Sequence, residues 1–388
     1  MELTQAEWTS RAAAFKAEIT ARADEIEQGR VLPQDLADKL AGAGLYKLLV
    51  PKTYNGYEVH PCTFLNVIDE VAQADGSAAW CLNICNTSGL VAAYLPPQHA
   101  QEIYGPDTAI TGGVFAPMGK ATSDGKSYTV NGTWNWGSGT SNCTWIMAGC
   151  MIMDDDGKPE KMASGAPLSR MMLLPRSEID IADTWHVTGL AGTGSNEFSI
   201  QNKQVPIDRS VALAIDKPLR DAPLYTFPSF GLLAIGIAAV AVGIAKGAAD
   251  EFIALAGAKT PQFSAKSLAN KSQTQTDFAT AMGLIEGGRA FLHDAVAQGY
   301  DNAAASGVLS DSDRARIRLA ATTATKNAAQ AVTLLYTAAG GTSVYLATPL
   351  QRRFRDVHVA TQHIMVASGT LELTGRVLLG VKTDTAML

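Results

Sequence analysis

The stretch Ala338–Gly380 reads AAGGTSVYLATPLQRRFRDVHVATQHIMVASGTLELTGRVLLG, and it says more about the fold than any other part of the chain. Its Gly340-Gly341 pair is typical of a helix end, because glycine adopts the left-handed conformation without strain. An Arg-Arg-Phe-Arg-Asp run follows, then His363, and then Ala-Ser-Gly-Thr at 367–370. An imidazole titrates near neutral pH, but an isolated histidine is more often structural than catalytic, so its residue type alone does not single out His363.

Composition narrows the class of protein. The chain has 388 residues, which exceeds a typical single core, so we expect two or three packed domains. A net charge of −6 argues against nucleic acid as a partner, because phosphate binding needs a basic face. The five cysteines form no CxxC pair, and Cys81 and Cys85, one helical turn apart, are expected to be buried small apolar side chains rather than ligands. The N-terminus has no signal-peptide pattern, so we expect a cytoplasmic protein.

One apolar segment has the composition of a membrane span. Ser229–Ala245 carries no charge, but its 17 residues would extend only about 26 Å, less than the roughly 30 Å of a bilayer core. Its Gly and Ala content suits close helix packing. We therefore predict a buried helix and no membrane association.

The sequence pattern divides the chain into three regions. Residues 1–107 predict an N-terminal helical domain, because apolar residues recur at spacings of three and four, first from Trp8 to Ile26 as one amphipathic helix. Residues 108–212 predict a small antiparallel β domain, a barrel, with Asp-Gly and Asn-Gly turns between short strands. Residues 213–388 predict a C-terminal four-helix bundle. The fold class is therefore mostly α with a β domain.

The expected helices can be given by range. In the first region, after the initial helix, they cover Pro33–Ala43, Phe64–Ala74 and Ala78–Leu95. In the bundle they cover 231–257, part of 264–299, a segment capped by Asp311 or Ser312 and stopped by Gly340-Gly341, and much of 355–380.

This order of domains, together with the 338–380 stretch, resembles the acyl-CoA dehydrogenase superfamily over nearly the whole chain. In those dehydrogenases a carboxylate before the Gly-Thr pair removes the substrate α-proton. Ser368 stands at that position here, and a serine cannot act as that base. The resemblance is therefore closest to the two-component (group D) flavin-dependent monooxygenases of the superfamily.

The resemblance implies a flavin site in the β domain. The motif NGTWNWGSG at 131–139 is similar to the strand that meets the flavin near N5, which places Trp136, Gly137 and Ser138 at the cofactor, with Ser138 also aiding catalysis. Taken alone, the motif fits equally well an ordinary strand with two core tryptophans. The same resemblance adds Phe115, in the loop 114–121, and Thr193 and Ser195, in a glycine-rich turn, to the flavin contacts.

Gly192-Thr-Gly194 is the only segment here that suggests a dinucleotide motif. A strand–loop–helix unit does not surround it, since a strand follows, so we do not predict NAD(P)H binding. An ordinary glycine-rich turn stays the alternative to a flavin contact.

The cofactor's phosphate side is implied by residues of the bundle. Lys259, Phe263, Gly340 and Gly341 match positions that hold the cofactor across a subunit boundary in the dehydrogenases, which implies a homotetramer. Thr260 and Thr337 replace the usual Arg and Gln there, and Lys259 offers only a point charge. These departures fit a protein that binds free reduced flavin, FMN or FAD, and later releases it.

His363 resembles the active-site histidine of the two-component monooxygenases, and we expect it to deprotonate or orient the substrate. Four residues on the helix that would cover the pocket are candidate substrate contacts: Trp80, Asn83, Asn86 and Thr87. Histidine spacing gives no metal site such as HExxH, so we predict no metal.

The predicted function is the oxygenase component of a two-component flavin-dependent monooxygenase. A separate NAD(P)H-dependent reductase would supply reduced flavin, which would react with O₂ to give a C4a-hydroperoxyflavin that oxygenates a small aromatic or heteroatom-containing substrate. One alternative is an acyl-CoA dehydrogenase whose base has moved to Glu372, one turn beyond Ser368. Another is a non-catalytic scaffold of the same fold.

Overall fold

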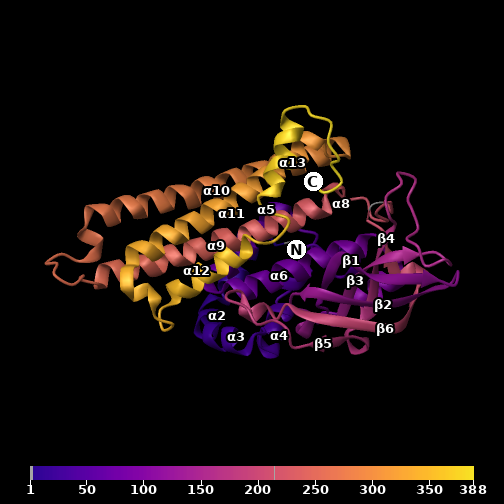
Figure 1. Ribbon diagram of the computed structural model, residues 1–388, viewed down its shortest axis with the longest axis horizontal. Helices are drawn as coiled ribbons and strands as arrows, with labels where there is room; N and C mark the ends of the chain where they lie inside the picture. The colour runs from indigo at the N-terminus through magenta and orange to yellow at the C-terminus, as the bar shows by residue number, and fades with distance from the viewer. Residues whose placement is uncertain (1–2, 214) are drawn as a thin grey trace.

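The computed structural model describes residues 3–213 and 215–388. Long C-terminal helices extend away from a β sheet, and the N-terminal helices lie against both (Figure 1). Helices, sheet and bundle follow one another along the chain as predicted, so the predicted fold class is confirmed.

The N-terminal region is helical throughout its described length. Its α-helices are α1 (Gln5–Ala13), α2 (Lys16–Ala21), α3 (Ala23–Gly29), α4 (Gln34–Gly42), α5 (Pro61–Ala74), α6 (Gly76–Ser88) and α7 (Pro97–Tyr104). The single first helix predicted from Trp8 to Ile26 is in fact α1, α2 and α3. The backbone turns at Phe15 and at Arg22, whose φ and ψ of −102° and 7° lie outside the helical region. Its apolar stripe stays buried across both turns.

The central region forms one seven-stranded sheet in the order β5-β6-β2-β1-β3-β4-β7. The strands are β1 (Thr111–Ser123), β2 (Ser127–Gly137), β3 (Trp145–Met153), β4 (Ser169–Pro175), β5 (Asp180–Ala182), β6 (Asn196–Pro206) and β7 (Ser210–Val211). The described strands form an open sheet where the sequence predicts a barrel, because the edge strands β5 and β7 are too short to pair and close it.

The sheet is also not wholly antiparallel, since β1 and β3 run parallel. β2 reverses the direction of β1, and the connection 138–144 then reverses it again. β3 pairs with β1 instead of β2, so the two run in the same direction. This connection carries Ser138 past the start of β1.

A bulge in β1 places four residues outside the ladder. Between Val114 and Gly119 the strand advances five residues while β3 advances two. Gly149 allows this, because a Cβ there would lie 2.4 Å from the carbonyl oxygen of Phe115. The Trp134 indole N–H also donates to the Gly149 carbonyl at 2.7 Å, which holds β3 in place behind the bulge.

The C-terminal region is built around α9 (Ser229–Ala258), with α8 (Pro223–Thr226) before it. The other helices are α10 (Ser272–Ser306), α11 (Asp311–Ala339), α12 (Pro349–Ala360) and α13 (Gly369–Leu378). α9 is long and apolar enough to cross a membrane, but 94% of its most apolar 18-residue window is buried within the structure. This agrees with the predicted core helix.

Two boundaries in the bundle differ from the prediction. Ser310, not Asp311 or Ser312, caps α11, since its hydroxyl accepts the Asp313 N–H. The single helix predicted over 355–380 is divided into α12 and α13 by the segment 361–368. The hydroxyls of Thr361 and Thr370 bond to nearby carbonyl oxygens there, which competes with continuous helix. The predicted stop at Gly340 is confirmed, with φ at 63°.

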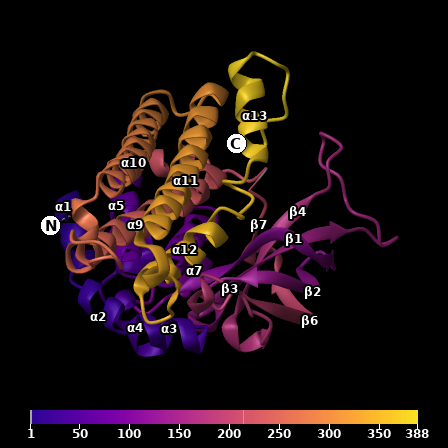
Figure 2. The ribbon, with the colours of Figure 1, turned by 60° about the vertical axis from the view of Figure 1, so that its left-hand side comes forward.

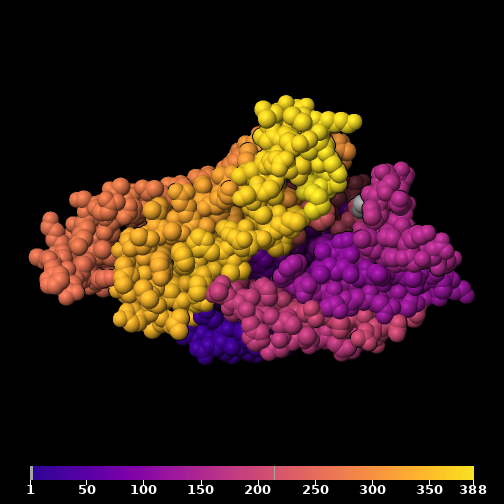
Figure 3. Space-filling view, in the orientation of Figure 1, coloured from indigo at the N-terminus to yellow at the C-terminus, as the bar shows by residue number. Residues whose placement is uncertain are grey.

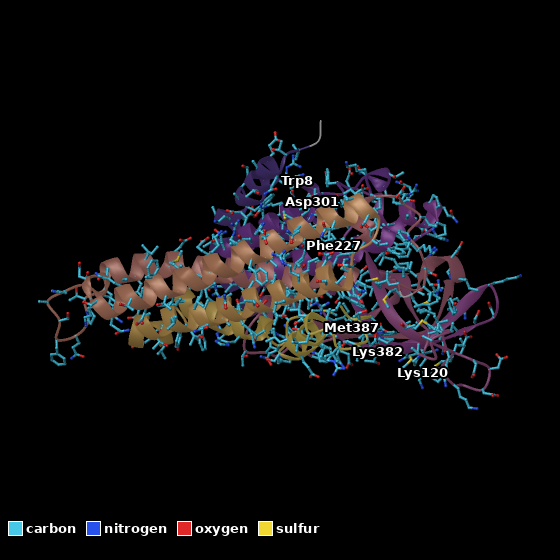
Figure 4. All side chains as sticks on the ribbon, turned by 90° about the horizontal axis from the view of Figure 1, so that it is seen from above. Trp8, Lys120, Phe227, Asp301, Lys382 and Met387 are labelled. Carbon is cyan, nitrogen blue, oxygen red and sulfur yellow. The ribbon has the colours of Figure 1, made fainter. Side chains whose placement is uncertain are left out.

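The C-terminal segment lies across the bundle from the N-terminus. α1 and α13 are on opposite sides in Figure 2. Seen from above, Lys382 and Met387 are likewise on the side away from Trp8 (Figure 4). The segment 361–368 thus approaches α6 and the sheet from the α12 side.

Glycines of α9 allow its close contact with α5, and one can be tested against a matched control. A Cβ at Gly243 would lie 2.4 Å from the backbone oxygen of Asp69, whereas at Gly257 it would meet nothing within 4 Å. We expect Gly243→Ala to lower the free energy of unfolding by about 1–3 kcal/mol through overpacking. Gly257→Ala should raise it by up to about 1 kcal/mol through helix propensity. Urea denaturation of both variants checks this, and equal effects would contradict it.

Candidate functional site

Three buried hydroxyl groups lie in a row where the loop after β2 meets the loop before β6. The Ser138 and Ser195 Oγ atoms are 2.6 Å apart, and the Ser195 Oγ lies 2.7 Å from the Thr193 Oγ1. The Thr193 hydroxyl also donates to the Leu190 carbonyl at 2.8 Å. The structure thus brings together three of the residues predicted at the flavin.

Local backbone geometry builds this row. Trp136, Leu190 and Gly194 all have positive φ, between 51° and 65°, which turns the chain sharply on both sides of the hydroxyls. The Gly139 N–H donates to the Thr193 carbonyl at 2.8 Å and joins the two loops. A Cβ at Gly137 would lie 2.9 Å from the Phe198 ring, so this approach needs glycine.

Trp80 of α6 connects the row to the C-terminal segment. Its indole N–H donates to the Ser138 Oγ at 3.1 Å. Its ring meets the imidazole of His363 edge-on, with centroids 5.7 Å apart and planes at 65°. Trp80, Ser138 and His363, each from a different domain, therefore form one site.

His363 is held in one protonation state. Burial and the nearby positive charge of Arg318 lower its pKa to about 4, so the imidazole is neutral at pH 7. Its Nδ1 accepts the Met365 N–H at 3.2 Å, which places the proton of the neutral ring on Nε2. His363 therefore offers a hydrogen-bond donor at Nε2. This geometry favours orienting a substrate over removing its proton.

Asp356, on α12, holds the loop that carries two of the three hydroxyl groups. Its carboxylate accepts the Leu190 N–H at 2.6 Å and so holds the loop that carries Thr193 and Ser195. Burial and the neighbouring Asp75 raise its pKa to about 7. Asp356 and His363 are seven residues apart, a spacing that a continuous helix would place on one face, but the break after α12 separates them.

The predicted substrate contacts on α6 differ in their surroundings. The Asn86 amide bonds to the backbone of Leu45, Leu48 and Leu82, and the Thr87 hydroxyl donates to the Ile84 carbonyl. The Asn83 amide is fully buried with no hydrogen-bond partner among the described residues, and it faces Gly236 of α9. Trp80 is the one of the four that contacts both Ser138 and His363.

The residues predicted at the phosphate side form a separate group at the far end of the bundle. The Lys259 ammonium donates to the Ala339 carbonyl at 2.6 Å, beside Gly340 and Gly341. Phe263 is 99% exposed on the loop between α9 and α10, which is the end of the bundle farthest from the sheet (Figure 1). Within one chain this group does not meet the hydroxyl row.

The residues at the hydroxyl row fit a flavin. A flavin ring needs apolar walls and hydrogen-bond partners at its N5 and O4 edge. Trp136 is 66% exposed two residues from Ser138, and the bulge of β1 presents Phe115 and Met118. The space-filling view shows a recess between the C-terminal segment, which carries His363, and the β domain, which carries Ser138 (Figure 3).

Two residues of the site carry no motif in the sequence. Arg318, on α11, is buried and donates to the carbonyls of Met365 and Met387. Asp356 is visible in the sequence as a charged residue, but its contact with Leu190 spans 166 positions. Arg318 follows Arg314 and Arg316 in the sequence, and nothing there distinguishes it as the one that is buried.

Comparisons with known proteins identify the family and agree with the fold. Residues 4–101 match the acyl-CoA dehydrogenase N-terminal domain, and residues 235–368 match the acyl-CoA dehydrogenase C-terminal domain. Indole-3-acetate monooxygenase of Pseudomonas putida is 30% identical over 362 residues, covering 93% of this chain and 90% of the relative. The flavin-dependent monooxygenase oxygenase subunit HsaA of Rhodococcus jostii is 30% identical over 351 residues, covering 88% and 90%. XiaF from Streptomyces sp., solved with FADH2 and glycerol, superposes with a TM-score of 0.89 at 26% identity, covering 97% of this chain and 96% of that chain.

The raised pKa of Asp356 predicts a pH dependence of stability. The unfolded carboxyl ionises near pH 4, but the folded one keeps its proton until about pH 7. The native state thus binds the extra proton between these values, so its stability falls as pH rises, by roughly 1 kcal/mol per pH unit. Asp356→Asn keeps the acceptor for Leu190 without ionising. Its free energy of unfolding should exceed that of the wild type more at pH 8 than at pH 5.

Urea denaturation at the two pH values measures this difference. Asp35→Asn is the matched control, because the pKa of this exposed carboxyl is lowered by the Arg22 guanidinium and it stays ionised over the whole range. Parallel pH profiles for Asp356→Asn and the wild type would refute the assignment.

Proposed function

Because the chain belongs to the acyl-CoA dehydrogenase superfamily and is a flavin-dependent monooxygenase, we propose that it is the oxygenase component of a two-component system. The single observation that carries the proposal is the contact of Trp80 with both Ser138 and His363. This arrangement presents hydrogen-bonding groups and an apolar ring, with no carboxylate contacting Ser138 or His363 among the described residues. It suits oxygen transfer better than removal of an α-proton.

The bound cofactor would supply two electrons, so that one atom of O₂ enters the substrate and the other leaves as water. Ser138 would hold the N5 edge of the ring. Trp136 and Phe115 would form its apolar walls, which exclude water and limit the loss of reducing equivalents as hydrogen peroxide.

The substrate we propose is a small aromatic molecule. The Trp80 and His363 rings meet edge-to-face beside Ser138, and a substrate ring can pack against them in the same way. The neutral imidazole would donate its Nε2 proton in a hydrogen bond to a substrate oxygen or nitrogen and so orient the ring. The names of the relatives, which include an indole-3-acetate monooxygenase, support an aromatic substrate.

The distant group at Lys259 supports assembly into a homotetramer. Five large apolar side chains at this end of the bundle are more than half exposed: Ile253, Phe263, Val344, Tyr345 and Leu346. Exposed apolar clusters of this kind mark interfaces. In the proposed assembly Lys259, Phe263, Gly340 and Gly341 would reach the phosphate side of a flavin, FMN or FAD, bound by a neighbouring subunit.

In this proposal a separate reductase supplies the reduced flavin. The glycine-rich turn at 191–194 leads into β6 and not into a helix, so it is unlike a dinucleotide-binding loop. The description of HsaA as an oxygenase subunit supports a division between two proteins. We place the pair in the cytoplasm, where the reductase can draw on NAD(P)H.

The alternative, a dehydrogenase with Glu372 as its base, has less support. Both Ser368 and Glu372 are exposed on and before α13, whereas a carboxylate base needs a site that excludes water. A non-catalytic scaffold would not require the buried, fully bonded hydroxyl row.

The test supplies the protein with FMN or FAD, a flavin reductase, NADH and O₂, and offers indole-3-acetate and simple phenols as probes. We expect an oxygenated product that carries one ¹⁸O atom from ¹⁸O₂, measured by mass spectrometry. Anaerobic mixing of the oxidised holoprotein with acyl-CoA thioesters should leave the flavin absorbance unchanged. Bleaching by an acyl-CoA, or flavin binding that is absent under all conditions, would overturn the proposal.

Replacement of His363 separates its role from flavin binding. We expect His363→Ala to lower oxygenated product per O₂ consumed by about 100-fold through loss of substrate orientation, with the difference appearing as hydrogen peroxide. The affinity for reduced flavin should stay within about twofold, since the imidazole acts on the substrate. His358→Ala, an exposed histidine bonded to Thr333, is the control. Equal losses of coupling and of flavin affinity would make His363 structural.

A further inference from the structure

The hydroxyl row is a chain of hydrogen bonds whose two ends have fixed polarity. At one end the Trp80 indole nitrogen can only donate, and it donates to the Ser138 Oγ. At the other end the Leu190 carbonyl can only accept, and it accepts from the Thr193 hydroxyl. Between these ends lie two contacts between hydroxyl groups, each of which could run in either direction when taken alone.

The fixed ends decide both directions. Each hydroxyl has one proton to give. Thr193 gives its proton to Leu190, so Ser195 has to donate to Thr193. Ser195 has then used its proton, so Ser138 has to donate to Ser195. Any other order would place two lone pairs against each other at 2.6–2.8 Å.

The far end of the chain is firmly held. The Leu190 carbonyl also accepts the Trp185 indole N–H at 3.1 Å, and its peptide N–H is bonded to Asp356. The Thr193 carbonyl is tied to Gly139. All three hydroxyl-bearing residues are buried, so water does not compete for these bonds. Because the Leu190 peptide is bonded at both its N–H and its carbonyl, it is the stable anchor of the chain.

Ser138 is consequently left with one lone pair and no proton. It accepts from Trp80, donates to Ser195, and offers its remaining lone pair to the site. The two redox states of a flavin differ at this point, since reduced flavin carries a hydrogen on N5 and oxidised flavin presents only a lone pair. A site that offers a lone pair matches the reduced state alone.

We propose that Ser195 and Thr193 are positioning residues that lock the Ser138 hydroxyl as a hydrogen-bond acceptor, and that this lock makes the site select reduced over oxidised flavin. The proposal rests on the proposed function, with Ser138 at the N5 edge. Ser195 and Thr193 act through Ser138 and need not touch the flavin.

The test compares the dissociation constants of oxidised and reduced FMN and FAD, measured by calorimetry under anaerobic conditions. In Ser195→Ala the Ser138 proton loses its acceptor and becomes free to bond to oxidised N5. We expect the preference for reduced flavin to fall by about tenfold, the effect of one mismatched hydrogen bond. For a two-electron couple this lowers the midpoint potential of the bound flavin by about 30 mV, which is a second readout.

Control variants distinguish loss of the fixed Ser138 orientation from a general disturbance of the folded protein. Ser195→Thr keeps a hydroxyl and should keep the preference. Thr325→Val removes a buried threonine hydroxyl of α11 that bonds only to its own helix, and should leave the preference unchanged. Thr193→Val removes the hydroxyl that joins Ser195 to the Leu190 carbonyl, allows both directions between Ser138 and Ser195, and should lower the preference as Ser195→Ala does.

The outcomes distinguish this inference from the proposed function. If the wild-type protein binds neither redox state, the proposed function itself fails. If it binds reduced flavin and Ser195→Ala and Thr193→Val keep its full preference and midpoint potential, the lock is refuted while the proposed function stands. A lowered preference in both, restored in Ser195→Thr, supports the lock.

Discussion

The contact between α12 and the loop before β6 is the constraint on which the site depends. The Asp356 carboxylate accepts the Leu190 N–H, and the Arg355 guanidinium donates to the Thr188 carbonyl at 2.7 Å. Gly189 lets the backbones touch, since a Cβ there would lie 2.5 Å from the Arg355 carbonyl carbon. The β domain is thereby fixed to the bundle at one place. The hydroxyl row lies on one side of this contact, and the His363 segment lies on the other.

The core helix α9 gives this junction its rigidity. It packs against α5, α6, α11 and α12, and its glycines bring it within direct backbone contact of α5. The helices that carry Trp80 (α6) and Asp356 (α12) therefore both pack against the same buried helix, α9. Close packing resists small displacements, so a hydrogen-bond chain that joins the N-terminal region to the β domain keeps its geometry.

Local patterns in the sequence predict the parts of this fold that depend on neighbouring residues. The apolar run of α9, the glycine stop at Gly340 and the order of helical and β regions are of this kind, and the His363 motif comes from the family resemblance. The parallel pairing of β1 with β3 and the break at 361–368 depend on long-range contacts, and no local pattern encodes them. The contact of Trp80 with Ser138 spans 58 positions, and that of Ser138 with Ser195 spans 57. The sequence and the family resemblance could therefore identify the three hydroxyl groups as candidates. They could not predict which hydroxyl is hydrogen-bonded to which.

The bulge of β1 has a consequence for how such an enzyme diversifies. Residues 115–118 lie outside the strand ladder, and Gly149 and Trp134 hold the bulge from behind. Within it, Phe115 is half-buried and packs against Phe230 of α9, whereas Ala116, Pro117 and Met118 are exposed and support no pairing of the sheet. Substitutions at 116–118 can reshape the wall of the recess without removing a buried contact, so evolution or a designer can change substrate range at these three positions with little loss of stability.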